Sequence, residues 1–159
     1  MPPPPPRKQP ARRPLIEGHN RAEIVFVTIC TVDRKPLLAR DWVHHLLLEA
    51  WTDPANHWAV GRYVLLPDHL HLFCAPARPD ALDLRRWVVY WKSLVSNRWR
   101  DTAEHPIWLP DLWDRQLRTG ESYDSKWNYV KQNPVRHGLT PDAEAWPYQG
   151  ELYRLDWHD

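Results

Sequence analysis

Two histidines separated by one residue carry the strongest chemical signal in the sequence. His69 and His71 follow the turn-forming pair Pro67-Asp68, in an apolar run that predicts a β-strand. Side chains alternate between the two faces of a strand, so both imidazoles are expected to point the same way. Two neutral imidazoles at this spacing can bind one metal ion. A lone His-x-His pair is also compatible with two residues at the edge of a core.

A tyrosine near the C-terminus supplies a second chemical group. The pattern over 122–132 predicts a helix that stops near Asn133, because the proline that follows disfavours helix at the preceding residue. Tyr123 falls on the apolar stripe of this helix and is expected in the core. Tyr129 falls off the stripe, so the sequence predicts a displayed side chain beside Lys126 and Asn133.

Together these two elements could form a site for phosphoryl chemistry. His69 and His71 would provide two metal ligands, and Asn133, one helical turn from Tyr129, could add an oxygen. An ion held in this way keeps positions open for a phosphate and polarises it. The Tyr129 hydroxyl could then attack a phosphodiester and form a phosphotyrosine link, which a free hydroxyl of a strand can reverse. The sequence shows no ligand-like pairing for the remaining candidates His44, His45, His57, His105 and His137.

The segments that must position these residues alternate in type. Periodicity predicts helices at 41–51, 82–100 and 122–132, and strands at 24–32, 58–66, 69–75 and 107–117. The order β-α-β-β-α-β is that of a ferredoxin-like α+β fold with an antiparallel sheet, and the added C-terminal helix carries the tyrosine. Asp41 is a candidate cap for the first helix, and Pro110 predicts an edge strand or a bulge. Trp87, Trp91 and Trp99 fit the apolar stripe of the 82–100 helix and are interpreted as packing residues.

Composition predicts one folded domain with oppositely charged ends. The chain has 159 residues and a net charge of +1. Residues 1–20 are expected to form a disordered, proline-rich basic arm. The folded domain is expected to span residues 21–140, and residues 141–159 are expected to form an acidic tail. Cys30 and Cys74 lie in apolar runs and are expected to be buried free thiols. Neither a membrane-spanning run nor a secretory signal is apparent, so a cytoplasmic protein without a membrane partner is expected.

The motifs resemble those of the HUH single-strand endonucleases and, within them, the REP-associated tyrosine transposases. The resemblance covers about residues 22–140 and rests on Tyr63–His71 (YVLLPDHLH), Trp91-Lys92-Ser93, Trp113–Arg118 (WDRQLR), Glu121-Ser122 and Tyr129–Leu139 (YVKQNPVRHGL). It implies that His69 and His71 bind a metal and that Tyr129 is the nucleophile. It also implies that Asn133 takes the place of a polar third ligand.

The resemblance further implies a substrate and a cofactor. It predicts a metal-dependent endonuclease and strand transferase that acts on single-stranded DNA with a hairpin, through a covalent 5′-phosphotyrosine intermediate. The implied cofactor is Mg²⁺ or Mn²⁺, and a monomer is favoured over a homodimer. The basic residues expected to contact DNA are Lys92, Arg115, Arg118, Lys126 and Arg136. Trp108 or Trp113 could stack on an unpaired base.

Three other functions stay open at this point. The chain could be a related protein that binds hairpin DNA without cutting it, although the presence of both histidines and the tyrosine argues against this. It could be a structural protein whose histidines lie at the edge of the core, a possibility that metal affinity would test. It could also be a relative that initiates replication or conjugation, but the small size and the Asn-Pro-Val-Arg text after the tyrosine favour a transposase.

Overall fold

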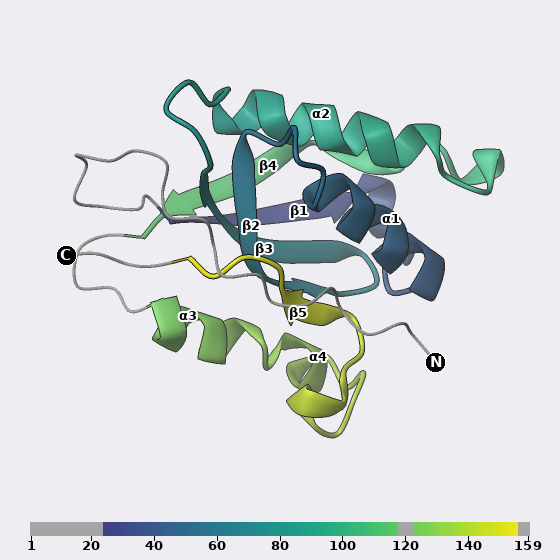
Figure 1. Cartoon of the computed structure of the whole chain (residues 1–159). Coiled ribbons are helices and arrows are strands. Elements are labelled where there is room, and N and C mark those ends of the chain that lie inside the picture. The colour runs from purple at the N-terminus through teal and green to yellow at the C-terminus, as the bar shows by residue number, and fades with distance from the viewer. Residues whose placement is uncertain (1–23, 118–122, 156–159) are drawn as a thin grey trace.

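A five-stranded antiparallel sheet forms the middle layer of the protein, with helices on both faces (Figure 1). The structure is a computed structural model that describes residues 24–117 and 123–155. The predicted basic arm (1–20) and Arg118 lie outside the described residues. Among the described helices, none is both long and apolar enough to cross a membrane.

The sheet has the topology that the sequence predicts for a ferredoxin-like fold. Its strands are β1 (Val25–Thr31), β2 (Trp58–Leu65), β3 (His69–Pro76), β4 (Trp108–Gln116) and β5 (Gln149–Glu151). They lie in the order β4-β1-β3-β2-β5, and each pair of neighbours is antiparallel. β4 is an edge strand, and its register with β1 shifts in the segment around Pro110, as the proline predicts.

Two helices cover each face of the sheet (Figure 1). One face carries α1 (Asp41–Trp51) and α2 (Leu84–Asn97), and the other carries α3 (Tyr123–Val130) and the single-turn α4 (Asn133–Arg136). Short 3₁₀ segments lie at η1 (Val32–Arg34), η2 (Thr102–Glu104) and η3 (Ala143–Ala145). Asp41 is the first residue of α1 and not its cap, because the N-cap position is taken by Arg40, which makes no side-chain cap bond.

The larger hydrophobic core lies between the sheet and the α1–α2 layer. Trp87, Trp91 and Trp99 are buried there, which confirms their interpretation as packing residues. Cys30 and Cys74 are buried and free, also as predicted. This core holds the sheet rigid from one side and leaves the other face to carry the polar residues of the candidate site.

A smaller core attaches α3 to the opposite face. Tyr123 is buried against Phe73, with ring centroids 4.9 Å apart. Its hydroxyl accepts a hydrogen bond from the backbone N–H of Arg62 at 2.9 Å. A Cβ added at Gly61 would lie 2.6 Å from the Tyr123 hydroxyl, so the absence of a side chain there permits the close approach of α3 to β2.

The segment predicted as an acidic tail contributes to the fold. β5 pairs with the edge of β2, with Gly150 opposite Tyr63. Leu152 and Leu155 are buried, and the indole of Trp146 donates a hydrogen bond to the carbonyl of Leu65 at 2.8 Å. The sequence does not predict this strand, since three residues are too few to show a period.

Candidate functional site

The two histidines of β3 lie together on the sheet face that carries α3 and α4. Their ring centroids are 5.0 Å apart, and His69 is 8% exposed. Leu70 and Leu72 are fully buried in the core on the other face. The alternation predicted from the sequence is therefore confirmed.

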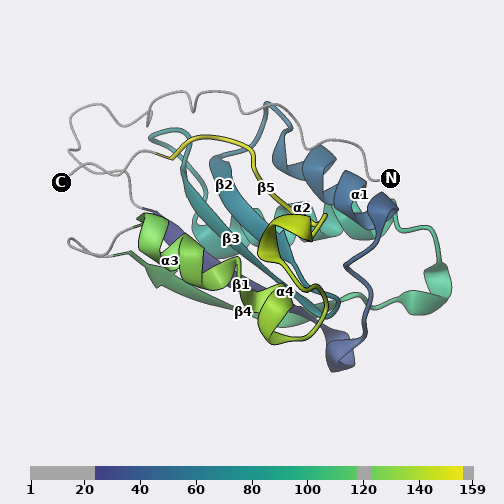
Figure 2. The ribbon, with the colours of Figure 1, turned by 90° about the horizontal axis from the view of Figure 1, so that it is seen from below.

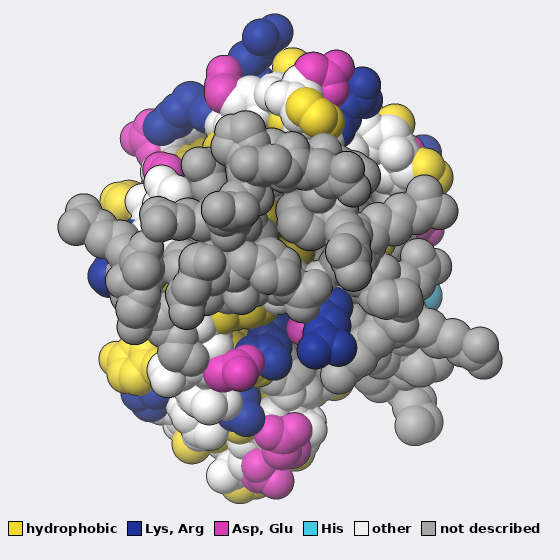
Figure 3. All heavy atoms as spheres, turned by 60° about the vertical axis from the view of Figure 1, so that its left-hand side comes forward, with side chains coloured by type: hydrophobic (Ala, Val, Ile, Leu, Met, Phe, Trp, Pro, Cys, Tyr) yellow, Lys and Arg dark blue, Asp and Glu magenta, His cyan; other side chains and the backbone are white. Residues whose placement is uncertain are grey.

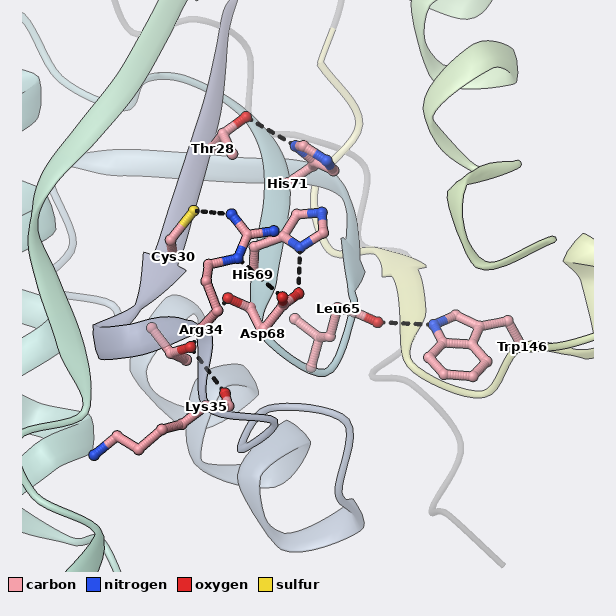
Figure 4. Close-up of polar contacts among 10 residues, drawn as sticks. Thr28, Cys30, Arg34, Lys35, Leu65, Asp68, His69, His71 and Trp146 are labelled. Carbon is pink, nitrogen blue, oxygen red and sulfur yellow. Dashed lines mark hydrogen bonds and ion pairs between the residues drawn. The ribbon is translucent and has the colours of Figure 1, made fainter. Parts of the chain in front are cut away.

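A neighbouring side chain anchors the Nδ1 atom of each imidazole (Figure 4). His71 Nδ1 lies 2.8 Å from the hydroxyl of Thr28 on β1, and His69 Nδ1 lies 2.7 Å from Oδ1 of Asp68. Such bonds orient the rings and leave the Nε2 atoms to bind a ligand. When an ion binds two imidazoles with metal–nitrogen distances of about 2.0–2.1 Å, the ring centroids are about 5 Å apart. The observed separation of 5.0 Å fits a shared ion.

Both imidazoles are neutral near pH 7. Burial lowers the pKa of His71 to about 3, and the neighbouring His69, Lys126 and His137 act in the same direction. Burial also lowers the pKa of His69, although the hydrogen bond to Asp68 opposes this shift. Neutral imidazoles have the lone pair that metal binding requires.

A turn after β1 supports Asp68 from the side away from His69. Arg34 Nε donates to Asp68 Oδ2 at 2.9 Å, and Arg34 Nη1 lies 3.5 Å from the sulfur of Cys30 (Figure 4). Asp33 and Arg34 have φ angles of 55° and 54°, in the left-handed region. This conformation costs about 1–2 kcal/mol per residue for an L-amino acid. It directs the guanidinium back onto the carboxylate that holds His69.

Tyr129 is displayed near the end of α3, as predicted, with 64% of its surface exposed. The guanidinium carbon of Arg136 lies 4.2 Å from the centroid of the Tyr129 ring. Arg136 Nη2 donates to the Tyr129 carbonyl at 2.6 Å and also to Oδ1 of Asn133. One arginine thus contacts both the candidate nucleophile and the candidate third ligand.

The ring of His137, which follows α4, lies beside the histidine pair. Its centroid is 6.0 Å from that of His69. The sequence shows no sign of this proximity, because it depends on how α4 packs against β3. In the part of the chain that the structure describes, no group of three or more His, Cys, Asp or Glu residues could hold a metal ion. The preformed part of the site is therefore the His69–His71 pair.

The basic residues predicted to contact DNA differ in their surroundings. Lys126 lies over the ring of Phe26, with Nζ 5.0 Å from the centroid, and is close enough to His71 to lower its pKa. Arg115 is exposed on β4, opposite Phe26 in the register. On the face shown in Figure 3, the described Lys and Arg side chains are interspersed with Asp and Glu. The described charges on this face therefore do not mark it as a DNA-binding surface.

Lys92 contradicts the prediction that it contacts phosphates. It is 7% exposed, and its Nζ donates to the carbonyl of Leu109 at 3.0 Å. Burial lowers its pKa to about 8. Lys92 belongs to α2, on the face of the sheet opposite the histidines, where it ties the helix to β4.

Two curated proteins similar to this chain carry the name REP-associated tyrosine transposase, one of them as putative. No protein-family model matches the chain. A REP-associated tyrosine transposase of Escherichia coli (strain K12) is 26% identical over 123 residues, which cover 72% of this chain and 70% of the relative. A putative REP-associated tyrosine transposase of Haemophilus influenzae is 25% identical over 155 residues, covering 84% and 86% of the two chains.

A solved structure agrees with the fold. It is described as a REP-associated tyrosine transposase bound to a REP hairpin, and it matches with a TM-score of 0.65 at 23% identity, over 81% of this chain and 76% of that one. The curated relatives confirm the resemblance indicated by the motifs: the chain is similar in sequence to REP-associated tyrosine transposases over most of its length.

Proposed function

We propose that the chain is a metal-dependent endonuclease and strand transferase that acts on single-stranded DNA bearing a hairpin. The observation that carries this proposal is the His69–His71 pair, in which both Nδ1 atoms are anchored and both rings are neutral. The transposase names of the two relatives and the REP hairpin bound to the structural relative support it.

The residues present fit a divalent ion such as Mg²⁺ or Mn²⁺. His69 and His71 would hold it through Nε2, and Asn133 is the proposed third ligand. A bound ion would supply Lewis-acid polarisation of the phosphate. Arg136 competes with an ion for Asn133 Oδ1, because its guanidinium donates a hydrogen bond to that oxygen.

Tyr129 is the proposed nucleophile. Its hydroxyl oxygen would form a bond to the phosphorus while the bond from phosphorus to the 3′ oxygen breaks. The phenolic proton passes through solvent to the departing oxygen, which leaves as a 3′ hydroxyl, and the 5′ phosphate stays on Tyr129. Attack by a 3′ hydroxyl of another strand reverses these steps and joins the DNA. Arg136 and Lys126 place positive charge beside the tyrosine and the histidine pair.

Covalent labelling tests this proposal. The protein is incubated with single-stranded hairpin DNA from the flanks of its own gene, labelled at the 3′ end so that the label stays on the fragment bonded to Tyr129. The reaction contains Mn²⁺ or a chelator and is run on a denaturing gel. A labelled protein band is expected with Mn²⁺ and is expected to vanish in Tyr129→Phe, which loses only the attacking oxygen. Tyr90→Phe is the matched control, since Tyr90 is an exposed tyrosine of α2 on the other face. A band that persists in Tyr129→Phe would refute the assignment.

A protein that binds hairpin DNA without cutting it is the second candidate. The observation that favours it is the hydrogen bond from Arg136 to Asn133 Oδ1, which gives the proposed third ligand a cationic partner within the protein. A shift on a native gel without a covalent band would support this function. Either function on DNA suggests a cytoplasmic protein, and we expect a monomer, which light scattering in solution would check.

A further inference from the structure

Trp113 is exposed on β4 although tryptophan is normally buried. It is 55% exposed, whereas the other tryptophans that the structure describes are buried or half-buried. Trp108, the other candidate for base stacking, packs against Trp91 with ring centroids 5.6 Å apart. A large apolar ring left in solvent has no packing role that explains its position.

The strand register places Trp113 on the same face as the histidine pair. Trp113 lies opposite Thr28 of β1, and Thr28 lies opposite His71 of β3. Residues paired directly across strands share a face, and two strand spacings are about 10 Å. Thr28 is also the residue that anchors His71. The row Trp113–Thr28–His71 therefore runs from the edge of the sheet to the candidate metal site.

The helices on this face leave the Trp113 end of the row uncovered. α3 lies over the adjacent row, where Trp127 contacts Phe73 with ring centroids 6.4 Å apart and Lys126 lies over Phe26. Figure 2, viewed from the α3 side, shows β4 along the margin of the sheet beside α3. The indole of Trp113 is thus accessible from solvent, and Lys126 lies over the adjacent row of the same face.

We infer that Trp113 is a stacking platform for an unpaired base of single-stranded DNA bound next to the phosphate site. This inference rests on the proposed function. Every base offers a π-face to an aromatic ring, and the cations Lys126 and Arg115 on the same face attract the phosphate backbone that carries the base. At about 10 Å from the histidines, the ring meets a nucleotide beside the cleaved phosphate and not the cleaved phosphate itself.

Fluorescence anisotropy with labelled hairpin DNA that carries a single-stranded flank tests the inference. Trp113→Ala is expected to weaken binding about 5- to 150-fold, the range for loss of one base–aromatic stack. Trp113→Phe keeps an aromatic face and is expected to retain most of the affinity. Tyr90→Ala, which removes an exposed aromatic ring from the opposite side of the sheet, is expected to leave affinity unchanged.

An abasic scan of the flank locates the stacked base without relying on a variant. Wild type is expected to lose affinity when one particular flank nucleotide lacks its base, and Trp113→Ala is expected to be insensitive to the same change. Equal affinity of wild type and Trp113→Ala, with a covalent adduct still formed, would refute the stacking role and leave the proposed function standing. Absence of both binding and adduct in wild type would refute the proposed function, and the inference with it.

Discussion

Removal of the Asp68 carboxylate is predicted to weaken metal binding without disturbing the fold. Asp68 Oδ1 lies 2.7 Å from His69 Nδ1, and Oδ2 accepts from Arg34 at 2.9 Å. Burial alone would raise the pKa of Asp68, but the hydrogen bonds with His69 and Arg34 lower it below its usual value. The charged carboxylate therefore keeps the proton of His69 on Nδ1 and the lone pair on Nε2, where the ion would bind.

The expected loss follows from this geometry. Carboxylates that hold a metal-ligating histidine typically contribute 10- to 100-fold to metal affinity, or about 1.4–2.7 kcal/mol. Asp68→Ala is expected to fall in this range. The backbone should stay in place, because the Asp68 carbonyl accepts hydrogen bonds from the N–H and the hydroxyl of Thr31 at 3.0 and 3.1 Å.

Calorimetric titration of Mn²⁺ into wild type and variants at pH 7 measures the effect. Asp80→Ala is the matched control, since Asp80 is an exposed aspartate that pairs with an arginine, Arg78, at 2.6 Å outside the site. His71→Ala gives the loss expected when a ligand itself is removed. If Asp68→Ala binds Mn²⁺ within twofold of wild type, or if Asp80→Ala loses as much, the proposed support of His69 is wrong.

Two further predictions concern packing and burial. Gly61→Ala would place its Cβ 2.6 Å from the Tyr123 hydroxyl, so the free energy of unfolding in urea is expected to fall by about 1–3 kcal/mol. Lys92 has a pKa of about 8 in the folded chain, against about 10.4 when unfolded, so the unfolded chain binds more protons between these values. The free energy of unfolding of wild type should therefore rise relative to that of Lys92→Met as the pH rises from 8 to 10. If the free energies of unfolding of the two proteins change in parallel with pH, the burial of the Lys92 amine is contradicted.

The order of the elements is predictable from the sequence because most segments are long enough to show a period. α1 occupies the predicted bounds Asp41–Trp51, and Tyr123 and Tyr129 have the predicted burial and exposure. The failures have physical causes. β5 spans only Gln149–Glu151, and its pairing partner β2 is far away in the sequence.

The candidate site is only partly predictable from the sequence, because part of it depends on contacts between segments that are distant in the chain. Strand alternation is a local property, so the shared face of His69 and His71 follows from their spacing. The approach of His137 to His69 depends on the packing of α4, which no local pattern encodes. The burial of Lys92 had a usable signal, because Lys92 lies four residues after Val88 and three before Val95, on the buried stripe of α2.

Arg136 provides a test of whether Asn133 is a metal ligand. Its guanidinium donates to Asn133 Oδ1 and lies 4.2 Å from the Tyr129 ring centroid. Arg136→Ala frees the amide oxygen and removes a cation near the histidine pair, so Mn²⁺ affinity is expected to rise. One hydrogen bond of about 0.5–1.5 kcal/mol corresponds to a gain of about 2- to 13-fold. The affinity for DNA is expected to fall, since a phosphate-binding cation is lost.

A double-mutant cycle with Asn133→Ala separates the two causes of the expected gain. If the gain comes from the freed oxygen, Arg136→Ala should raise Mn²⁺ affinity only when Asn133 is present. If it comes from the lost charge, the gain should be equal in both backgrounds, because the charge acts on the ion whether or not the amide is there. An equal gain would remove Asn133 from the ligand set and leave His137, whose ring already lies beside His69, as the candidate to replace it.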